Sequence, residues 1–370
     1  MIKRGLLLML TIVIASGLVL AGCSQPSTST TTTTPAPAEK QEPITLLFAT
    51  WESPEGGFYV EGIKAFAADL EKKTNGKVKV EFSWAQALGK TPEYYDLTVK
   101  GVCDAGFCVP FQAKGVFPMA EIASLPFHFP SAEIATKTAF ELYQKGLLDK
   151  AFDENVKVLF LIGGMGNPLF TVKKPVTTLA DMKGLKVRTS GGAYNDRVSA
   201  MGGVPVFIPG SESYLALERG TVGATLEDYG TIRTWKTCEL LRYATEPPMG
   251  TVILAFLMNK DTYNRLPEDV RSVIDEMARN NEYGLIAAKT FGGLVEKGRQ
   301  CFLDHGGTIV QWEPAALNEL GQRFQPLWSK WIEEREAMGL PARQAVGEMW
   351  SLLKQQGVDP PAFGYSLSGQ

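Results

Sequence analysis

The sequence predicts an α/β protein with two lobes. Apolar segments that alternate like buried strands are repeatedly followed by segments with helical spacing, which is the pattern of sheets covered by helices. Roughly 327 of the 370 residues follow a Ser/Thr/Pro-rich stretch, and a single core usually stops growing at roughly 250–300 residues. A glycine-rich stretch at residues 163–166 lies between two predicted strands. We interpret it as the crossing between lobes, where backbone torsions must change at low cost.

The N-terminus predicts export from the cytoplasm. Residues 1–22 begin with Lys3 and Arg4 and continue as an almost wholly apolar stretch, which is typical of a secretory signal peptide. Residues 23–43 are rich in Ser, Thr, Pro and Ala and cannot form a packed core, so they predict a tether. We therefore expect the body of the protein in the periplasm or at the outer face of the cytoplasmic membrane.

The end of the predicted signal peptide, Leu20-Ala21-Gly22-Cys23, resembles the lipobox of bacterial lipoproteins. The resemblance implies that the chain is cut before Cys23 and that lipid is attached to its sulfur and to the new N-terminus. A membrane anchor through this lipid is expected, with an unmodified thiol as the alternative.

The first lobe is predicted over residues 44–166, where strands and helices alternate. Asn75-Gly76 ends the first helix. In order, the predicted elements are a buried strand at 44–49, a helix at 62–73, a strand at 77–82, a short helix at 94–100, and strands at 103–109 and 155–161.

The second lobe is predicted over residues 167–250, with a return segment to the first lobe over residues 251–370. Leu266-Pro267-Glu268-Asp269 is a helix-start signal, and few helix breakers follow before His305, so we expect one long helix that packs on both lobes. The other predicted elements are a strand at 168–172, a capped turn at 178–181, a strand at 185–187, a helix at 194–201, a strand at 204–208, a helix at 211–219 and a strand at 251–259.

Composition and charge argue against nucleic-acid binding and against a membrane-spanning segment in the body of the protein. The net charge is −3 with acids and bases interspersed, so the chain lacks the basic footprint of a nucleic-acid-binding protein. No apolar run after residue 43 is long enough to span a bilayer.

Cysteines beyond Cys23 fall into two pairs. Cys103 and Cys108 lie in a predicted strand, where an odd separation places side chains on opposite faces, so we expect two buried free thiols. Cys238 and Cys301 are able to form a disulfide in an oxidising compartment, but sequence alone leaves their pairing open.

The chain lacks the motifs of an enzyme. Its two histidines, His128 and His305, have no metal-ligand spacing, and no Gly-x-Ser-x-Gly elbow occurs. The glycines at 163–166 lead into a strand, whereas a dinucleotide fingerprint leads into a helix. We therefore expect no catalysis and no cofactor.

Aromatic residues at predicted loops suggest a binding cleft. A cleft between two lobes that combines aromatic rings with a few polar groups binds small molecules, and hinge closure buries the ligand. Most of these rings are nevertheless expected to pack in the core. They are Trp51, Tyr59, Phe111, Phe127, Tyr194, Tyr229 and Trp235.

Ordered landmarks through nearly all of residues 44–310 resemble the substrate-binding proteins of TRAP (tripartite ATP-independent periplasmic) transporters. The most specific block is in the second lobe. It comprises Pro175 followed by Asp-Met-Lys-Gly-Leu-Lys-Val-Arg at 181–188, then Met-Gly-Gly-Val-Pro-Val at 201–206, and Tyr-Leu-Ala-Leu-Glu-Arg-Gly-Thr-Val at 214–222. Further landmarks are Phe66-Ala67, residues 73–78, Leu88-Gly89, Phe117-Pro118, residues 125–127 and residues 266–270.

The resemblance implies a two-lobed periplasmic-binding-protein fold with a ligand cleft between the lobes. It also implies that Arg188, which closes the Lys-Gly-Leu-Lys-x-Arg strand, pairs with a ligand carboxylate. A guanidinium suits this role because its planar fork of donors matches both carboxylate oxygens. A solvated charge at a sheet edge is the alternative. The expected ligand-binding residues are Arg188, Trp51, Glu52, Asn167, Ser190, Glu227 and Tyr229.

The sequence departs from the family in two places. Many members carry a second arginine where this chain has Gly166-Asn167-Pro168, so a second cationic clamp is doubtful. Glu227-Asp228 stands where relatives often place an asparagine or a Glu-Trp pair. The ligand is then a small organic acid, an amino-acid-like zwitterion or an acid bridged by a cation, for which Glu227 is a possible ligand. In the alternative, both acids face solvent.

Together these features predict a monomeric carrier that captures a small carboxylate by hinge closure and delivers it to TRAP permease subunits in the membrane. A ligand-sensing co-receptor lipoprotein is the alternative, and a secreted hydrolase is the less favoured one.

Overall fold

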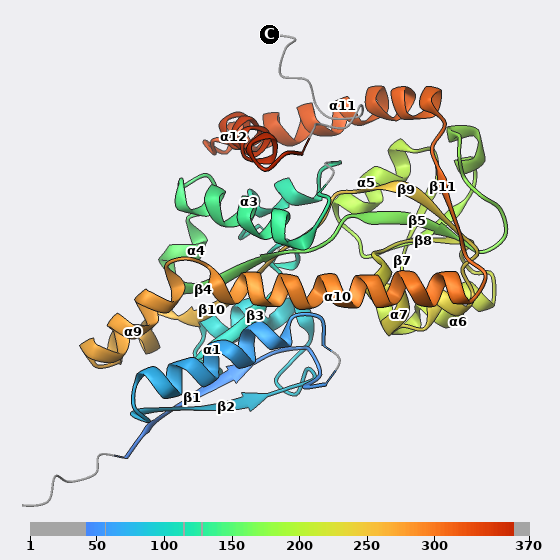
Figure 1. Ribbon diagram of the computed structural model, residues 1–370. Helices are drawn as coiled ribbons and strands as arrows, with labels where there is room; N and C mark the ends of the chain where they lie inside the picture. Colours follow the sequence, from blue (N-terminus) through green and yellow to red (C-terminus); the bar gives the residue numbers. More distant parts are fainter. Residues whose placement is uncertain (1–41, 56, 114, 127–128, 359–370) are drawn as a thin grey trace, which may run out of the picture. The chain divides into compact units, whose positions relative to one another are not determined.

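A computed structural model describes residues 42–358 except residues 56, 114, 127 and 128 (Figure 1). The predicted signal peptide, Cys23, nearly all of the tether, Phe127 and His128 lie outside the described residues. No helix in the described part of the chain is long and apolar enough to cross a membrane.

The first lobe is built on a five-stranded sheet with the order β2-β1-β3-β10-β4. β1 pairs in parallel with β2 and β3, whereas β10 is antiparallel to β3 and β4. Every residue of β10 is buried, as expected for an inner strand covered on both faces. The bounds are β1 (Ile44–Ala49), β2 (Val78–Ser83), β3 (Ala105–Cys108), β4 (Val156–Gly163) and β10 (Ile253–Asn259).

Helices cover this sheet. The predicted helix at 62–73 is confirmed as α1 (Val60–Lys73), whose apolar residues Ile63, Phe66 and Leu70 are buried. The remaining helices of this lobe are α2 (Tyr94–Val99), α3 (Ala132–Gln144), α4 (Ala151–Glu154), α8 (Lys260–Arg265) and α9 (Glu268–Ala278), with 3-10 turns η1 (Thr91–Glu93), η2 (Pro110–Gln112) and η3 (Ala120–Ser124).

The second lobe has a six-stranded sheet with the order β11-β9-β5-β8-β6-β7. Its strands are β5 (Asn167–Thr171), β6 (Lys186–Thr189), β7 (Val204–Phe207), β8 (Ala224–Leu226), β9 (Tyr243–Met249) and β11 (Thr308–Gln311). Its helices are α5 (Ala193–Ala200), α6 (Ser213–Glu218) and α7 (Tyr229–Thr234), with turns η4 (Leu179–Met182), η5 (Gly210–Glu212) and η6 (Thr237–Glu239).

The return segment does not belong wholly to the first lobe. β10 enters the first sheet as predicted, but β11 pairs in parallel with β9 in the second sheet. The expectation that residues 251–370 return to the first lobe is therefore corrected for β11. Its sheet is decided by backbone pairing with β9, which the local sequence does not reveal.

The glycine-rich crossing is confirmed, but its physical reason is different from the predicted one. Positive φ values occur at other glycines and not at Gly163, Gly164 or Gly166. A Cβ at Gly163 would lie 2.4 Å from the backbone carbon of Ala135, and one at Gly166 would lie 2.9 Å from the Cβ of Pro248. Close approach of neighbouring segments therefore requires glycine here.

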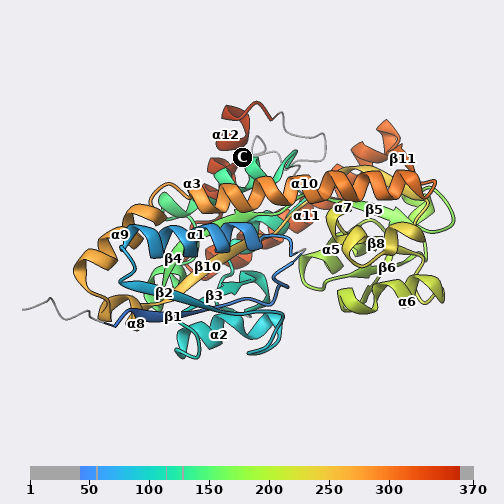
Figure 2. The same ribbon diagram turned by 60° about the horizontal axis from the view of Figure 1, so that its bottom comes forward.

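The long helix predicted up to His305 is two helices after the short α8. α9 ends at Ala278, and Asn281 in the left-handed conformation, with φ 54°, precedes α10 (Glu282–Asp304). The amide of Asn281 binds both backbone groups of Leu161 at 2.8 and 2.9 Å, which fixes the break against β4. The contacts to both lobes are confirmed, since α10 packs on α1, α3 and β4 and also on α7 and η6 (Figure 2).

Two C-terminal helices were not predicted. α11 (Pro314–Ala337) contacts α5 of the second lobe, and α12 (Ala342–Gln355) contacts α3 of the first. Trp328 of α11 is fully buried, and Arg335 forms an ion pair with Glu121 of η3. This segment therefore packs on both lobes, as α10 does.

The cysteines differ partly from expectation. Cys103 and Cys108 are buried free thiols, as expected. They do not lie on opposite faces of one strand, because β3 starts only at Ala105, and the hydroxyl of Thr98 lies 3.6 Å from the sulfur of Cys103 and also interacts with Cys108.

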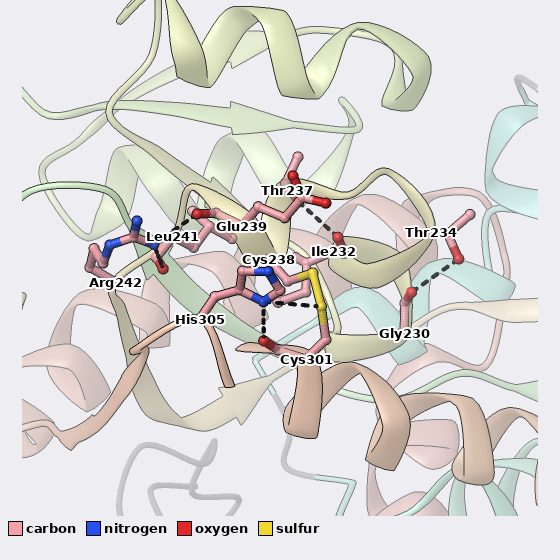
Figure 3. Close-up of a disulfide and its surroundings, with 10 residues drawn as sticks. All are labelled: Gly230, Ile232, Thr234, Thr237, Cys238, Glu239, Leu241, Arg242, Cys301 and His305. Carbon is pink, nitrogen blue, oxygen red and sulfur yellow. Dashed lines mark hydrogen bonds between the residues drawn. A yellow bond between two sulfur atoms is a disulfide. The ribbon is translucent and has the colours of Figure 1, made fainter. Parts of the chain in front are cut away.

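Cys238 and Cys301 form a disulfide that joins η6 to α10 (Figure 3). Beside it, Nδ1 of His305 lies 2.8 Å from the backbone oxygen of Cys301. The C-terminal half of α10 is therefore attached covalently to the second lobe.

Candidate functional site

Arg188 lies inside the protein, near the end of β6. Its side chain is only 4% exposed, so the alternative of a solvated charge is wrong. Nε donates to the backbone oxygen of Ile208 at 2.8 Å, and Nη1 donates to Oε1 of Glu227 at 2.5 Å. The third nitrogen, Nη2, has no hydrogen bond to any residue that the structure describes. One side of the guanidinium is thus fixed by the protein, and the N–H groups of Nη2 remain for a ligand.

Strand pairing explains why Glu227 reaches Arg188. β6 and β8 are parallel neighbours, with Arg188 opposite Thr225, and Glu227 follows β8 at the same edge of the sheet. Oε2 of Glu227 accepts a hydrogen bond from the hydroxyl of Thr225 at 2.9 Å. Ligands of open α/β sheets bind outside the carboxyl ends of parallel strands, which is where this pair lies.

Glu227 is buried, with a side chain 3% exposed, so the alternative in which it faces solvent is wrong. Burial raises the pKa of its carboxyl group, while the charge of Arg188 and the hydroxyl of Thr225 lower that pKa. Because both oxygens are engaged by protein donors, the arrangement gives no separate support to Glu227 as a cation ligand. Among the described residues, the one group of three candidate metal donors is Cys238, Cys301 and His305, of which the two cysteines are disulfide-bonded.

Asp228 and Tyr229 have structural contacts. Asp228 is the N-cap of α7, and its carboxylate accepts the backbone N–H and the hydroxyl of Thr231 at 2.9 and 2.6 Å. The ring of Tyr229 packs edge-on against Phe170 with centroids 5.0 Å apart, and its hydroxyl donates to Glu246 at 3.0 Å. The expectation that Tyr229 faces the ligand is corrected, because the first turn of α7 directs its ring into the core beneath α10.

Aromatic residues of the first lobe lie at the boundary with the second. Trp51 stacks on Phe107 with centroids 5.6 Å apart and an interplanar angle of 16°, and Tyr59 lies 5.9 Å from the same ring. Phe111 faces Tyr194 of the second lobe at 6.5 Å. The indole N–H of Trp51 is buried and has no hydrogen-bond partner in the described part of the chain. These rings form an apolar wall with an unused donor.

The side chain of Glu52 holds the loop before α1 in place through hydrogen bonds to its backbone. Oε1 accepts the backbone N–H groups of Phe58 and Tyr59 at 2.8 and 3.2 Å, and Oε2 accepts that of Tyr59 at 3.1 Å. Burial raises the pKa of this carboxyl group to about 8, although the two backbone donors lower it. A large fraction of Glu52 is therefore protonated at neutral pH.

Asn167 and Ser190 lie beside the crossing and after β6, respectively. Asn167 is 5% exposed and begins β5, where it pairs with Met249, and its Oδ1 has no hydrogen-bond partner among the described residues. Ser190 is half-buried. Asn167 therefore offers a buried, unused polar atom at the boundary between the lobes.

Arg197 is a residue that the sequence analysis missed. It is 1% exposed, its Nη1 donates to the backbone oxygen of Met249, and its guanidinium lies 4.3 Å from the ring centroid of Tyr194. Its Nε and Nη2 are buried without a hydrogen-bond partner among the described residues. A signal was present: Tyr194, Val198 and Met201 have the spacing of a buried helix face, and Arg197 occupies the same face.

Charges of both arginines act on Tyr194. Burial raises the pKa of its hydroxyl, Arg197 and Arg188 lower that pKa, and Asp228 raises it. Tyr194 thus contacts Arg197 directly and lies within electrostatic range of Arg188 and Asp228. Trp235 is elsewhere, since its indole packs against Gly210.

Comparisons with known proteins agree with this arrangement. The family model for bacterial extracellular solute-binding proteins, family 7, matches residues 49–335. The C4-dicarboxylate-binding periplasmic protein of Rhodobacter capsulatus is 30% identical over 290 residues, covering 75% of this chain and 84% of that relative.

Solved structures show the same fold. A TRAP periplasmic solute-binding protein from Desulfovibrio salexigens, in an open complex, superposes with a TM-score of 0.77 at 26% identity, covering 85% of this chain and 97% of that one. A TRAP solute-binding protein from Rhodoferax ferrireducens with copurified benzoate gives a TM-score of 0.75 at 26% identity, with 85% and 98% covered.

Proposed function

Because this chain belongs to family 7 of the bacterial extracellular solute-binding proteins, we propose that it captures a small organic acid outside the cytoplasm and delivers it to a TRAP-type transporter. Proteins of this family bind solutes and are in general not enzymes. The relatives support a carboxylate as the recognised group, since one binds C4-dicarboxylates and another carries benzoate.

The observation that carries the proposal is the buried guanidinium of Arg188, whose Nη2 has no hydrogen bond to any described residue. Its Nε and Nη1 are held by Ile208 and Glu227, so the side chain is oriented before a ligand arrives. A carboxylate oxygen that binds Nη2 gains a charge-assisted hydrogen bond in a site shielded from water. The ring of Trp51, which stacks on the fully buried Phe107 of the first lobe, supplies apolar contact.

Closure of the lobes on the ligand follows from contacts on both sides. A ligand shifts the equilibrium toward the closed state only by its greater affinity for that state. Contacts to Arg188 in the second lobe and to the aromatic wall in the first are both complete only when the lobes are together, so the ligand favours closure.

Substitution of Arg188 tests the proposal. A thermal-shift screen of organic acids and amino acids, including benzoate, succinate and compounds with an amino group, first identifies ligands. Calorimetry of Arg188→Lys is then expected to show binding weaker by a factor of about ten or more, since a charge-assisted hydrogen bond contributes roughly 1.5–3 kcal/mol. Arg219→Lys, which changes an exposed arginine of the same lobe, is the control. Unchanged affinity in Arg188→Lys would refute the role of Arg188, and the absence of any acid ligand would refute the function.

We further propose that Cys23 carries the lipid that anchors the protein to the membrane. The support is the Leu-Ala-Gly-Cys sequence that ends the apolar N-terminal stretch. After fractionation of expressing cells, the protein is expected in the membrane fraction, and Cys23→Ala is expected to lose this association. A Cys23→Ala variant that remains membrane-bound would exclude the anchor.

A further inference from the structure

Arg197 is a buried cation that forms no ion pair with any residue in the described part of the chain. We propose that Arg197 is a second ligand-binding arginine and that the site selects an organic acid with a single negative charge, a monocarboxylate. The proposal rests on the function proposed above and specifies its ligand class, which the relatives leave open because they bind either dicarboxylates or benzoate.

The contacts of Arg197 leave its charge uncompensated. Its hydrogen-bond partners among the described residues, the carbonyl of Met249 and the hydroxyl of Tyr194, are both neutral, and the ring of Tyr194 adds a cation–π contact. Arg188, by contrast, has the carboxylate of Glu227. Taking a charge out of water without a counter-ion is unfavourable, and a cation–π contact offsets only a part of that cost. An anion supplied by the ligand would remove this cost.

Among the described residues, the other charged groups nearby supply no second unpaired cation. Arg188 and Glu227 neutralise each other. Asp228 also acts on Tyr194, and the backbone N–H and hydroxyl of Thr231 at the start of α7 stabilise its carboxylate without cancelling its negative charge, which disfavours additional carboxylates nearby. Glu52 is engaged by backbone N–H groups in its own loop. Arg197 is thus the cation of this group that has no carboxylate beside it, so one ligand carboxylate pairs with it, and a second ligand carboxylate would find no further unpaired cation among these residues.

Other unused polar atoms lie near Arg197, where the two segments that join the sheets, residues 163–166 and 250–252, run side by side. Met249, whose oxygen holds Arg197, pairs with Asn167, and the Oδ1 of Asn167 is buried without a partner among the residues described. The hydroxyl of Thr251, two residues further on, is likewise unpartnered and 1% exposed. A polar ligand group at this point would meet donors and acceptors that the protein itself leaves unused.

The backbone leaves room for the guanidinium. Gly250 has a φ of +62°, and a Cβ there would lie 2.4 Å from Nη1 of Arg197 and 2.9 Å from the backbone oxygen of Ser124 in the first lobe. Arg197 therefore sits where the second lobe, the crossing and η3 of the first lobe meet.

Calorimetry with matched acids tests the proposal. Wild type is expected to bind a monocarboxylate more tightly than its diacid counterpart, benzoate against phthalate and butyrate against succinate. Arg197→Gln is expected to weaken binding of the preferred monocarboxylate by about tenfold or more, as expected for a lost charged hydrogen bond. Arg197→Lys, which keeps the charge, should retain part of the affinity, and Arg219→Gln is the exposed control.

The melting temperature of the ligand-free protein distinguishes a ligand-binding role of Arg197 from a structural one. If Arg197 serves the ligand, its buried unmatched charge destabilises the free protein, and Arg197→Gln should leave the melting temperature unchanged or raise it. A variant that melts lower while its affinity is preserved would make Arg197 a structural connector and overturn the proposal, as would a wild type that prefers diacids. Loss of binding in Arg188→Lys but not in Arg197→Gln would overturn this inference and leave the proposed function standing.

Discussion

Glu227→Gln tests the central ion pair of the site. The side chains of Arg188 and Glu227 are 4% and 3% exposed and meet at 2.5 Å. Removing one member of a buried pair costs about 3–5 kcal/mol, because the other charge stays buried without compensation. Glutamine keeps one oxygen that is able to accept from Nη1, so we expect the lower end, about 3 kcal/mol. For a protein of this size this corresponds to a melting temperature lower by about 6 °C.

The same substitution should strengthen binding of acids. In the free wild type, Glu227 already compensates Arg188, so a ligand carboxylate gains only part of the charge interaction. In the variant the carboxylate becomes the counter-ion, and the ligand therefore restores stability that the substitution removed. We expect a larger ligand-induced rise in melting temperature for Glu227→Gln than for wild type, and a larger gain in affinity for phthalate than for benzoate.

The assay is thermal denaturation with and without each acid, followed by calorimetry. Glu218→Gln, which changes an exposed glutamate of α6, is the matched control. If the free variant melts at the wild-type temperature, the pair contributes nothing to stability. If acids bind the variant more weakly at unchanged stability, Glu227 orients Arg188 for the ligand and does not compete with it, and the reasoning above is refuted.

Two further predictions concern stability. The disulfide between Cys238 and Cys301 closes a loop with a sequence separation of 63 residues, so the double alanine variant should lose about 4 kcal/mol, measured by denaturant unfolding, and a reducing agent should then have no further effect on it. Because burial raises the pKa of Glu52 from 4.5 to about 8, its stabilising contribution is complete below pH 4.5 and is lost as pH rises through 8. The stability of Glu52→Gln should therefore decline less over this range, by up to about 5 kcal/mol, and parallel pH profiles would contradict the assignment.

Local patterns in the sequence determined the order of elements. Apolar spacing identified α1 and β10, and the glycines at 163–166 located the crossing, since each depends on residues close together in the chain. The long C-terminal helices α11 and α12 were missed, and the break at Asn281 was not foreseen, because it depends on hydrogen bonds to Leu161 in a distant strand.

The sequence by itself determined two things about Arg188. It ends a predicted strand, and it belongs to an ordered set of motifs typical of a carboxylate-binding family. Only the tertiary structure decided how that arginine is used. Glu227 reaches Arg188 because β6 and β8 are neighbours in a sheet, Tyr229 turns into the core because of the cap at Asp228, and Arg197 is left without a counter-ion. Periodicity reports which face of an element is buried, whereas charge compensation depends on which distant groups share that buried space.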